Sequence, residues 1–362
     1  MRSKILNFLI IVMISATLLA GVELGIRWLS PQGVLTTYPE GGPLGLKDPV
    51  VGHTNRPNTV VAINAPEFTV EYKVDENGFR ETRFPANAAD DGSTIKILLL
   101  GDSFTFGASN ELGDIWPELL AQKFLDEGMS VQLINAGVPG YNTSQQALYL
   151  ERLSEKYNPD IVLVTFLPND MFANEPIRTV DGVDVAYSDV SSVVGSGNIK
   201  KSSLHSVTML KRMLMANDQS YTKLYLMTPR RAFFTTPMSE LFQAKVETTK
   251  QVFTRMATFT QSQGSELVVV SVPQLFQVLQ AAKTSSDPEV DPGLPDRLME
   301  GVVAEQGFQW HEALPYLTEE YSSTGKDLYF RYDGHLNADG NRVLSDFMFQ
   351  ILAPLIKTKA AG

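Results

Sequence analysis

The sequence predicts an α/β fold built on a parallel sheet with helices on both of its faces. Three observations lead to this prediction. From residue 94 onward short apolar segments alternate with amphipathic ones, the apolar segments are apolar throughout, and the 362-residue chain is long enough for a large core. Strands buried on both faces show that continuous apolar pattern. With 43% hydrophobic and 20% charged residues, a disordered, collagen-like or polytopic membrane chain is excluded.

The main domain is predicted to cover residues 94–358, with its elements assigned from apolar runs bounded by turn residues. Its strands are predicted at residues 95–100, 131–135, 160–166 and 266–272, and its helices at 116–127, 144–157, 240–263 and 338–356. An insertion at about residues 171–240 interrupts this alternation. Within it we expect a hairpin at 179–185, because an Asp-Gly pair stands between two apolar runs, and a helix around 206–215.

The insertion is basic although the protein is acidic. Between residues 200 and 231 there are seven Lys or Arg residues and one Asp. One interpretation is a solvated helical face. The other is a lid that guides an anionic glycan or touches a membrane surface. The sequence leaves both open.

The N-terminus, residues 1–29, is predicted to be a membrane anchor. Arg2 and Lys4 precede an uncharged run at residues 5–22, which as a helix measures roughly 27 Å and just spans a bilayer core. A cleaved signal peptide is the alternative, but Leu18 stands where a cleavage site needs a small residue, and the apolar pattern continues to residue 29. The basic residues at the front place the N-terminus in the cytoplasm and the remainder on the exported side.

Residues 30–93 are predicted to form a linker followed by a small β-rich lead-in. Alternating runs at 59–63 and 68–72 indicate short strands, and a hairpin is one way to join them. We expect the lead-in to supply an edge strand to the main domain rather than to form a separate binding module.

Charge and residue types exclude several classes of function. The formal charge of −11 opposes binding to a phosphate backbone, so no nucleic-acid partner is expected. The chain has no cysteine, which excludes disulfides, thiol catalysis and Cys-ligated metals. The motifs of zinc peptidases, P-loops, dinucleotide-binding folds and α/β-hydrolase elbows do not occur. We therefore predict no cofactor and no metal.

Chemically distinctive residues follow the predicted strands. Ser103 comes just after the first strand, Gly140 lies in the loop after the second, and Asn169 follows the third. Asp333 and His335 stand just before the last helix. Because ligands of parallel sheets bind beyond the carboxyl ends of the strands, these residues are expected at one edge of the sheet. Together they supply a nucleophile, oxyanion donors, a base and an orienting acid.

The four segments resemble the four sequence blocks of the SGNH (GDSL-type) hydrolases, a family of serine esterases and acyl-transferring enzymes, over about residues 95–356. The resemblance implies a flavodoxin-like three-layer α/β/α sandwich. It also implies a role for five residues: Ser103 as nucleophile, His335 as base, Asp333 as acid, and Gly140 and Asn169 as oxyanion donors beside the backbone of Ser103.

Two features depart from the commoner family pattern. Phe104 stands where the family has its name-giving Leu, which affects packing more than chemistry. Asp333 and His335 are separated by one residue instead of two. The shorter spacing is similar to that of membrane-associated, polysaccharide-modifying members such as the alginate-acetylation proteins.

Physical chemistry supports these roles independently. A serine hydroxyl needs a neighbouring base to take its proton, and histidine is the side chain suited to this near neutrality. Of the four histidines, only His335 lies in a Gly- and Asn-containing loop beside a carboxylate; His53, His205 and His311, the last expected to open a helix, are predicted to be structural or superficial. The N–H groups of Ser103 and Gly140 and the Asn169 amide would stabilise an oxyanion.

The sequence thus predicts a membrane-anchored, extracytoplasmic serine esterase that removes O-acyl groups, O-acetyl above all, from carbohydrate through an acyl-Ser103 intermediate. Its partners would be an O-acylated carbohydrate or another ester and, through the N-terminal helix, a membrane. Two alternatives remain: an O-acetyltransferase of a cell-surface or exported polysaccharide, and a non-catalytic glycan-binding subunit. The second is disfavoured because all five residues of the site are intact.

Overall fold

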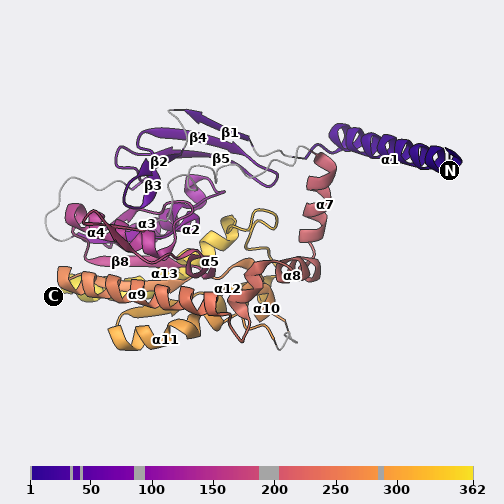
Figure 1. Cartoon of the computed structure of the whole chain (residues 1–362). Coiled ribbons are helices and arrows are strands. Elements are labelled where there is room, and N and C mark those ends of the chain that lie inside the picture. The colour runs from indigo at the N-terminus through magenta and orange to yellow at the C-terminus, as the bar shows by residue number, and fades with distance from the viewer. Residues whose placement is uncertain are drawn as a thin grey trace.

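A parallel sheet forms the centre of the protein, whose computed structural model describes residues 2–32, 36–40, 44–84, 94–186, 204–283 and 289–361 (Figure 1). The five strands run in the order β12-β11-β8-β6-β7, and every neighbouring pair is parallel. They are β6 (Ile95–Leu100), β7 (Val131–Asn135), β8 (Ile161–Phe166), β11 (Glu266–Ser271) and β12 (Gln309–Glu312). The predicted parallel sheet is confirmed.

Helices cover both faces of the sheet, which confirms the three-layer α/β/α sandwich. Alternate residues of β6 point to opposite faces, with Leu98 and Leu100 in one core and Ile97 and Leu99 in the other. The first core is closed by α4 (Thr143–Tyr157), α9 (Glu240–Gln263) and α11 (Leu294–Gln306). The second is closed by α3 (Trp116–Asp126), α10 (Leu275–Ala281), α12 (Leu314–Thr324) and α13 (Ala338–Ala361).

Short elements follow the strands at the sheet edge where the strands end. The helix α2 (Ser103–Phe106) follows β6 directly, the 3-10 turn η1 (Leu112–Asp114) precedes α3, and α5 (Pro168–Ala173) follows β8. These elements carry two of the predicted site residues, Ser103 and Asn169.

The insertion contains the predicted hairpin and helix. The hairpin consists of β9 (Arg178–Val180) and β10 (Val183–Val185), and three helical segments come later: α7 (His205–Met215), α8 (Asp218–Leu226) and the 3-10 helix η2 (Pro229–Phe234). Residues 187–203, with Lys200 and Lys201 of the predicted basic stretch, lie outside the described residues.

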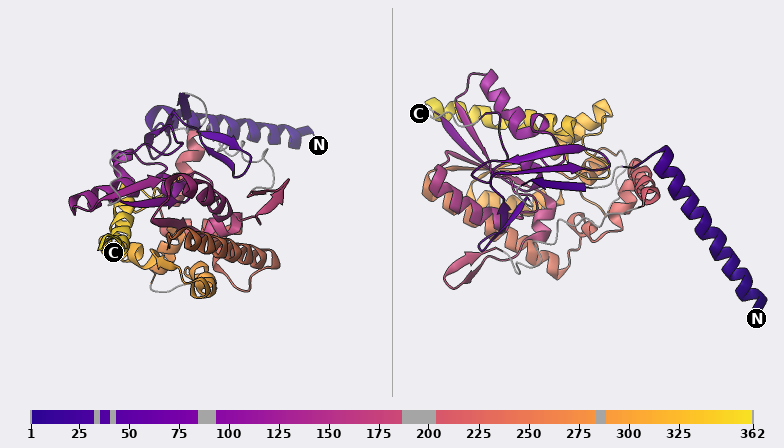
Figure 2. Two further views of the ribbon diagram at one scale, coloured as in Figure 1. Left: turned by 90° about the vertical axis from the view of Figure 1, so that its left-hand side faces the viewer. Right: turned by 90° about the horizontal axis from the view of Figure 1, so that it is seen from above.

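The lead-in forms sheets of its own. β1 (Thr36–Glu40), β4 (Thr59–Asn64) and β5 (Thr69–Val74) make an antiparallel sheet, and β2 (Gly45–Asp48) pairs with β3 (Gly52–Asn55) (Figure 2). The predicted hairpin is present as β4 and β5, but the expected edge strand is wrong, since none of these described strands joins the central sheet. The alternating apolar face of β5 instead packs on Phe106 of α2.

The helix α1 (Arg2–Leu29) projects away from the rest of the molecule (Figure 2). Its segment Lys4–Leu29 has a mean hydropathy of 2.5 and no buried residue, so its length and composition suffice to cross a membrane. A signal sequence has the same properties.

A buried arginine joins the lead-in to the loop that follows α2. The guanidinium of Arg80 donates to the carbonyl oxygens of Phe106 at 3.2 Å, Gly107 at 2.5 Å and Asn110 at 2.7 Å, and it lies over the ring of Tyr72 in β5. The Arg80 residue is only 3% exposed. Burial lowers the pKa of Arg80 to about 10, so the group is charged at neutral pH and its three bonds are charge-assisted.

We expect Arg80→Met to lower the free energy of unfolding by about 3 kcal/mol, because three carbonyl groups lose a charged donor. Urea unfolding of the full chain in detergent, followed by tryptophan fluorescence, measures this change. Lys73→Met is the matched control on β5, because the Lys73 side chain is 54% exposed; it should cost no more than about 0.5 kcal/mol. Equal effects of the two substitutions would contradict the role given to Arg80.

Candidate active site

Ser103 begins the short helix α2 at the carboxyl end of β6, where the Asp102 side chain caps the helix. The Asp102 carboxylate accepts the backbone N–H of Phe104 at 2.8 Å. Asp102 is buried, whereas Ser103 is only partly buried. Burial raises the pKa of Asp102, against the effect of the Phe104 hydrogen bond. The strand-to-helix turn therefore presents the Ser103 hydroxyl at the surface on a fixed backbone.

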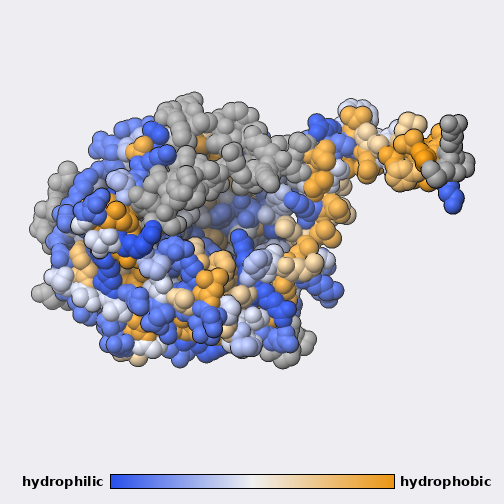
Figure 3. All heavy atoms as spheres, viewed as in Figure 1, coloured by the Kyte–Doolittle hydropathy of each residue, from blue (hydrophilic) through white to orange (hydrophobic). Residues whose placement is uncertain are grey.

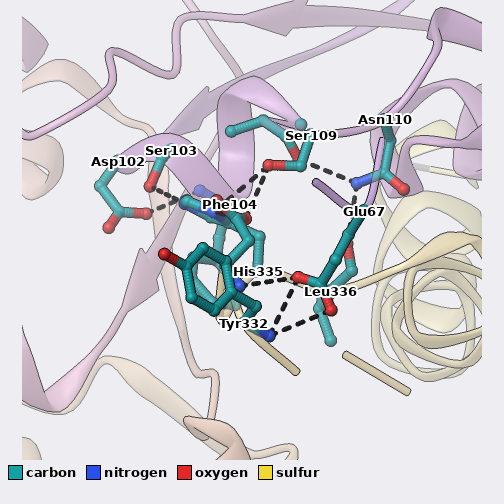
Figure 4. A network of polar contacts seen from close by, with 12 residues as sticks. Glu67, Asp102, Ser103, Phe104, Ser109, Asn110, Tyr332, His335 and Leu336 are labelled. Carbon is teal, nitrogen blue, oxygen red and sulfur yellow. Dashed lines mark hydrogen bonds and ion pairs between the residues drawn. The ribbon is translucent and has the colours of Figure 1, made fainter. Parts of the chain in front are cut away.

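Three predicted site residues come together in a line of hydrogen bonds (Figure 4). The Oγ atom of Ser103 lies 2.8 Å from Nε2 of His335, and Nδ1 of His335 lies 2.5 Å from Oδ1 of Asp333. The His335 and Asp333 side chains are 25% and 21% exposed, so small molecules can reach them. Although Asp333 and His335 are only two residues apart, Gly334 between them has a φ of +94°, a conformation that glycine adopts without strain.

The Asp333 carboxylate controls the ionisation of His335. Burial alone would lower the pKa of His335, but the hydrogen bond and charge of Asp333 outweigh it, and that pKa lies above its ordinary value of 6.5. Burial likewise acts to raise the pKa of Asp333, but its hydrogen bonds with His335 and Ser109 prevail and hold that pKa below its ordinary value. The pair thus favours an imidazolium beside a carboxylate.

Gly140 lies in the loop that follows β7, the strand next to β6 in the sheet. Its φ is +85° and a side chain there would meet nothing within 4 Å, so the backbone is open to an approaching ligand. The same loop packs tightly against α2 at Gly137, where a Cβ atom would come within 2.4 Å of the Phe106 nitrogen. His53 of the lead-in supports the loop through a 3.0 Å hydrogen bond with the Pro139 carbonyl.

Asn169 is oriented by partners on both ends of its amide. Its Oδ1 accepts the Gln274 side-chain N–H at 2.8 Å, and its Nδ2 donates to Asp170 at 3.3 Å. Burial raises the pKa of Asp170, and the charge of Asp102 adds to that increase. The Asn169 side chain also forms a hydrogen bond with Asp102, which acts to lower the pKa of that carboxyl against the effect of burial.

Gln274 was not predicted from the sequence, although its position after a predicted strand is a signal that could have identified it. Gln274 comes shortly after β11, and polar residues that follow a strand of a parallel sheet lie at the edge where ligands bind. The hydroxyl of Tyr225, in α8 of the insertion, donates to Oε1 of Gln274 at 2.5 Å. The insertion thus contacts the residue that orients Asn169.

Sequence reasoning also missed two residues that hold the loop of Asp333. The Glu67 carboxylate, in the turn between β4 and β5, accepts the backbone N–H groups of Tyr332 at 2.9 Å and Asp333 at 2.8 Å. The Ser109 hydroxyl donates to Oδ1 of Asp333 at 2.7 Å (Figure 4). Nothing in the alternating pattern around Glu67 signals this role, because the contact joins positions 265 residues apart.

The lead-in holds this loop indirectly as well. Tyr72 accepts the backbone N–H of Ser109 at 2.6 Å, and Asn110 donates to the Leu336 carbonyl at 2.8 Å. With Arg80 bound to the carbonyls of Gly107 and Asn110, the segment after α2 is clamped between the lead-in and the last loop. Ser109 has a φ of +69°, a conformation that a residue with a side chain keeps only where its surroundings enforce it.

The other histidines lie away from the Ser103 hydroxyl. Nδ1 of His205 accepts the Gln32 backbone N–H at 2.9 Å. His311 was expected to open a helix, but it lies within β12, and α12 begins only at Leu314. Burial lowers the pKa values of His53 and His311. Within the described ranges, no cluster of three or more His, Asp or Glu side chains is arranged to hold a metal ion.

The Glu67 contacts lead to a stability prediction. Glu67→Ala should lower the free energy of unfolding by about 2 kcal/mol, because two partly buried N–H groups lose their acceptor. Glu67→Gln is the matched variant: its amide oxygen still accepts, and it relieves a carboxylate whose pKa is raised, first by burial and then by the charge of Asp333. The midpoint of urea unfolding of Glu67→Gln should equal or exceed that of the wild type. A loss of stability equal to that of Glu67→Ala would contradict this account.

Comparisons with known proteins fit this geometry. Residues 99–343 match the model of the GDSL-like lipase/acylhydrolase family, a stretch that contains all five predicted site residues. An arylesterase of Vibrio mimicus is 32% identical over 97 residues, which are 27% of this chain and 48% of that relative. The chain therefore matches about half the length of this curated relative.

Two solved structures also resemble the chain over most of its length. TesA is 14% identical, with a TM-score of 0.42 over 72% of this chain and 99% of its own. The acetyl xylan esterase AlAXEase is 13% identical, with a TM-score of 0.44 over 71% of this chain and 100% of its own. Because the family model covers more than half of the sequence and spans the sheet edge where Ser103, His335 and Asp333 meet, the chain belongs to the GDSL-like lipase/acylhydrolase family of serine ester hydrolases.

Proposed function

We propose that the protein hydrolyses carboxylic esters, with Ser103 as nucleophile, His335 as general base and Asp333 as the acid that orients it. The hydrogen-bonded line from Ser103 Oγ through both nitrogens of His335 to Asp333 supports this proposal most directly. A nucleophile, a base and an orienting group in that order are the requirements for acyl transfer through serine.

The reaction would follow from this geometry. Nε2 of His335 takes the Ser103 proton as Oγ attacks the ester carbonyl, and Asp333 stabilises the imidazolium that forms. The oxyanion is met by the N–H groups of Ser103 and Gly140 and by the Asn169 amide. The intermediate collapses to acyl-Ser103 as the alcohol leaves with the proton from His335. A water molecule, deprotonated by His335, then releases the acid and restores the serine.

We further propose that the substrate is an O-acetylated carbohydrate outside the cytoplasm. The Asp333–His335 spacing, similar to that of polysaccharide-modifying members, supports the carbohydrate. The exposed, membrane-length helix α1 behind Arg2 and Lys4 supports anchoring with the catalytic body on the exported side. The insertion, whose Tyr225 hydroxyl contacts Gln274, offers a surface along which a polymer could lie.

The first test is hydrolysis of p-nitrophenyl acetate by the full chain in detergent. Ser103→Ala and His335→Ala should each reduce kcat by at least about 10³-fold, because members of such a triad act as a unit. Ser109→Ala is the control hydroxyl deletion in the same site, and it should retain far more activity because its hydroxyl supports Asp333 rather than attacking the ester. Turnover that survives in Ser103→Ala would refute the proposed nucleophile.

The pH dependence provides a second test. His335 acts as a base only when neutral, so kcat/KM should rise with pH through a midpoint above 6.5, the ordinary pKa of histidine. In Asp333→Asn burial still lowers the pKa of His335, while the hydrogen bond and charge of Asp333 are lost and only the charge of Asp102 opposes burial. The midpoint should therefore fall, while kcat drops by about 10³- to 10⁴-fold. Measuring kcat/KM against pH at high enzyme concentration decides this, and an unshifted midpoint would contradict control of His335 by Asp333.

The substrate is tested by acetate release from an O-acetylated polysaccharide, with Ser103→Ala as the blank. Release at a rate well above that of the blank supports the carbohydrate. A small ester that is cleaved while the polysaccharide is not would overturn it, and a preference for long-chain esters would overturn the acetyl group. If added sugar acceptors become acetylated faster than acetate appears, the protein is a transferase instead.

A further inference from the structure

The helix α7 of the insertion exposes several large apolar side chains. Leu210, Met213 and Leu214 are 57%, 64% and 40% exposed, whereas Thr208 is only 4% exposed. Surface helices normally bury their apolar side chains and present polar ones to water. Leu210, Met213 and Leu214 form an outward apolar face that the described residues leave uncovered.

The polar face of α7 is fixed to the rest of the protein by hydrogen bonds. Glu23 of α1 accepts the backbone N–H groups of His205 and Ser206, each at 2.9 Å, at the start of α7. Gln32 donates to His205 at 2.9 Å and accepts from Arg212 at 3.0 Å. Rolling α7 so as to bury its apolar face would break the side-chain bonds of Ser206 with Glu23 and of Arg212 with Gln32.

The position of α7 indicates what covers the outward face. It begins at the carboxyl end of α1 and runs across the axis of that helix rather than along it (Figures 1 and 2). The apolar surface of α1 continues onto α7 (Figure 3). At the junction Trp28 and Leu29 are 84% and 75% exposed. If α1 crosses a bilayer near its normal, α7 lies in the plane of the same bilayer, at the level where amphipathic helices bind.

We propose that the outward face of α7 lies in the interface of the membrane that α1 spans, with its side chains at the boundary of headgroups and acyl chains. This inference rests on the proposed anchoring by α1. A lipid surface suits the face better than a second copy of the chain, because the face is continuous with a helix that is itself exposed to lipid. The exposed Lys211 beside it can reach anionic headgroups. The body would then be held at the membrane by two elements, with a fixed orientation.

The sequence makes the test straightforward, because it contains no cysteine. Single-cysteine variants Leu210→Cys and Met213→Cys carry the fluorophore NBD, and the full chain is reconstituted into vesicles of phosphatidylcholine and phosphatidylglycerol. Met13→Cys reports insertion of α1, and Lys357→Cys, exposed near the far end of the molecule, is the aqueous control. Doxyl-labelled lipids should quench the probes at 210 and 213 at least about fivefold more strongly than the probe at 357.

Each outcome decides the inference. Strong quenching at 13, 210 and 213 supports it, and adding Leu210→Glu should reduce quenching at 213 to the level of the control. Quenching at 13 with water-like probes on α7 overturns it and leaves the anchor in place. A third outcome is a blue-shifted probe on α7 that lipid does not quench and whose blue shift disappears when the protein is diluted into more lipid. That result means that a second copy of the chain covers the face, and it overturns the inference. No quenching at 13 overturns both the anchor and the inference, while ester hydrolysis by the same sample tests the catalytic proposal separately.

Discussion

The candidate site depends on one constraint, the alignment of the carboxyl ends of neighbouring parallel strands. β6 delivers Ser103, β8 delivers Asn169 and β11 delivers Gln274 to the same edge of the sheet. Burial of these strands on both faces sets their register, since a shift would move apolar side chains out of the two cores. A loop that returns just before α13 then needs only to bring His335 to this edge.

That returning loop is the part of the site that the sheet does not position. Its hydrogen bonds come instead from the turn at Glu67 and from Ser109, and Ser109 is held in turn by Tyr72. The lead-in thus supports Asp333 both directly and through the segment after α2. Arg80 completes this support with a charge that burial would make costly without its three carbonyl partners.

Local patterns were sufficient to predict a parallel sheet, four of its strands, the covering helices α3, α4, α9 and α13, and the meeting of Ser103, Asp333 and His335, because strand ends and turn residues are visible in short stretches of sequence. The shorter elements α10, α11, β12 and α12 were not assigned residue ranges. The supports at Glu67, Ser109 and Gln274 were not predicted, since each is a polar residue in an ordinary turn or loop whose partner is remote in sequence. The prediction that the lead-in supplies an edge strand to the central sheet was wrong, again because a contact remote in sequence decides the packing. Alternation indicates that a strand has one buried face but does not say which surface covers it, and here the cover is Phe106 of α2.

The contacts of Glu67 and Arg80 show that the region matched by the family model is smaller than the structural unit to which it belongs. The stretch matched by the family model starts at residue 99, whereas the hydrogen-bonded structure that holds Asp333 reaches back at least to the β4–β5 turn. Proteolysis at an exposed site between the β4–β5 turn and residue 99 would cut the chain, but hydrogen bonds would still join the two fragments. A nicked protein of this kind should stay associated and behave as one body, much as a complemented enzyme fragment does. A segment outside the matched family region is thus part of the scaffold that holds Asp333.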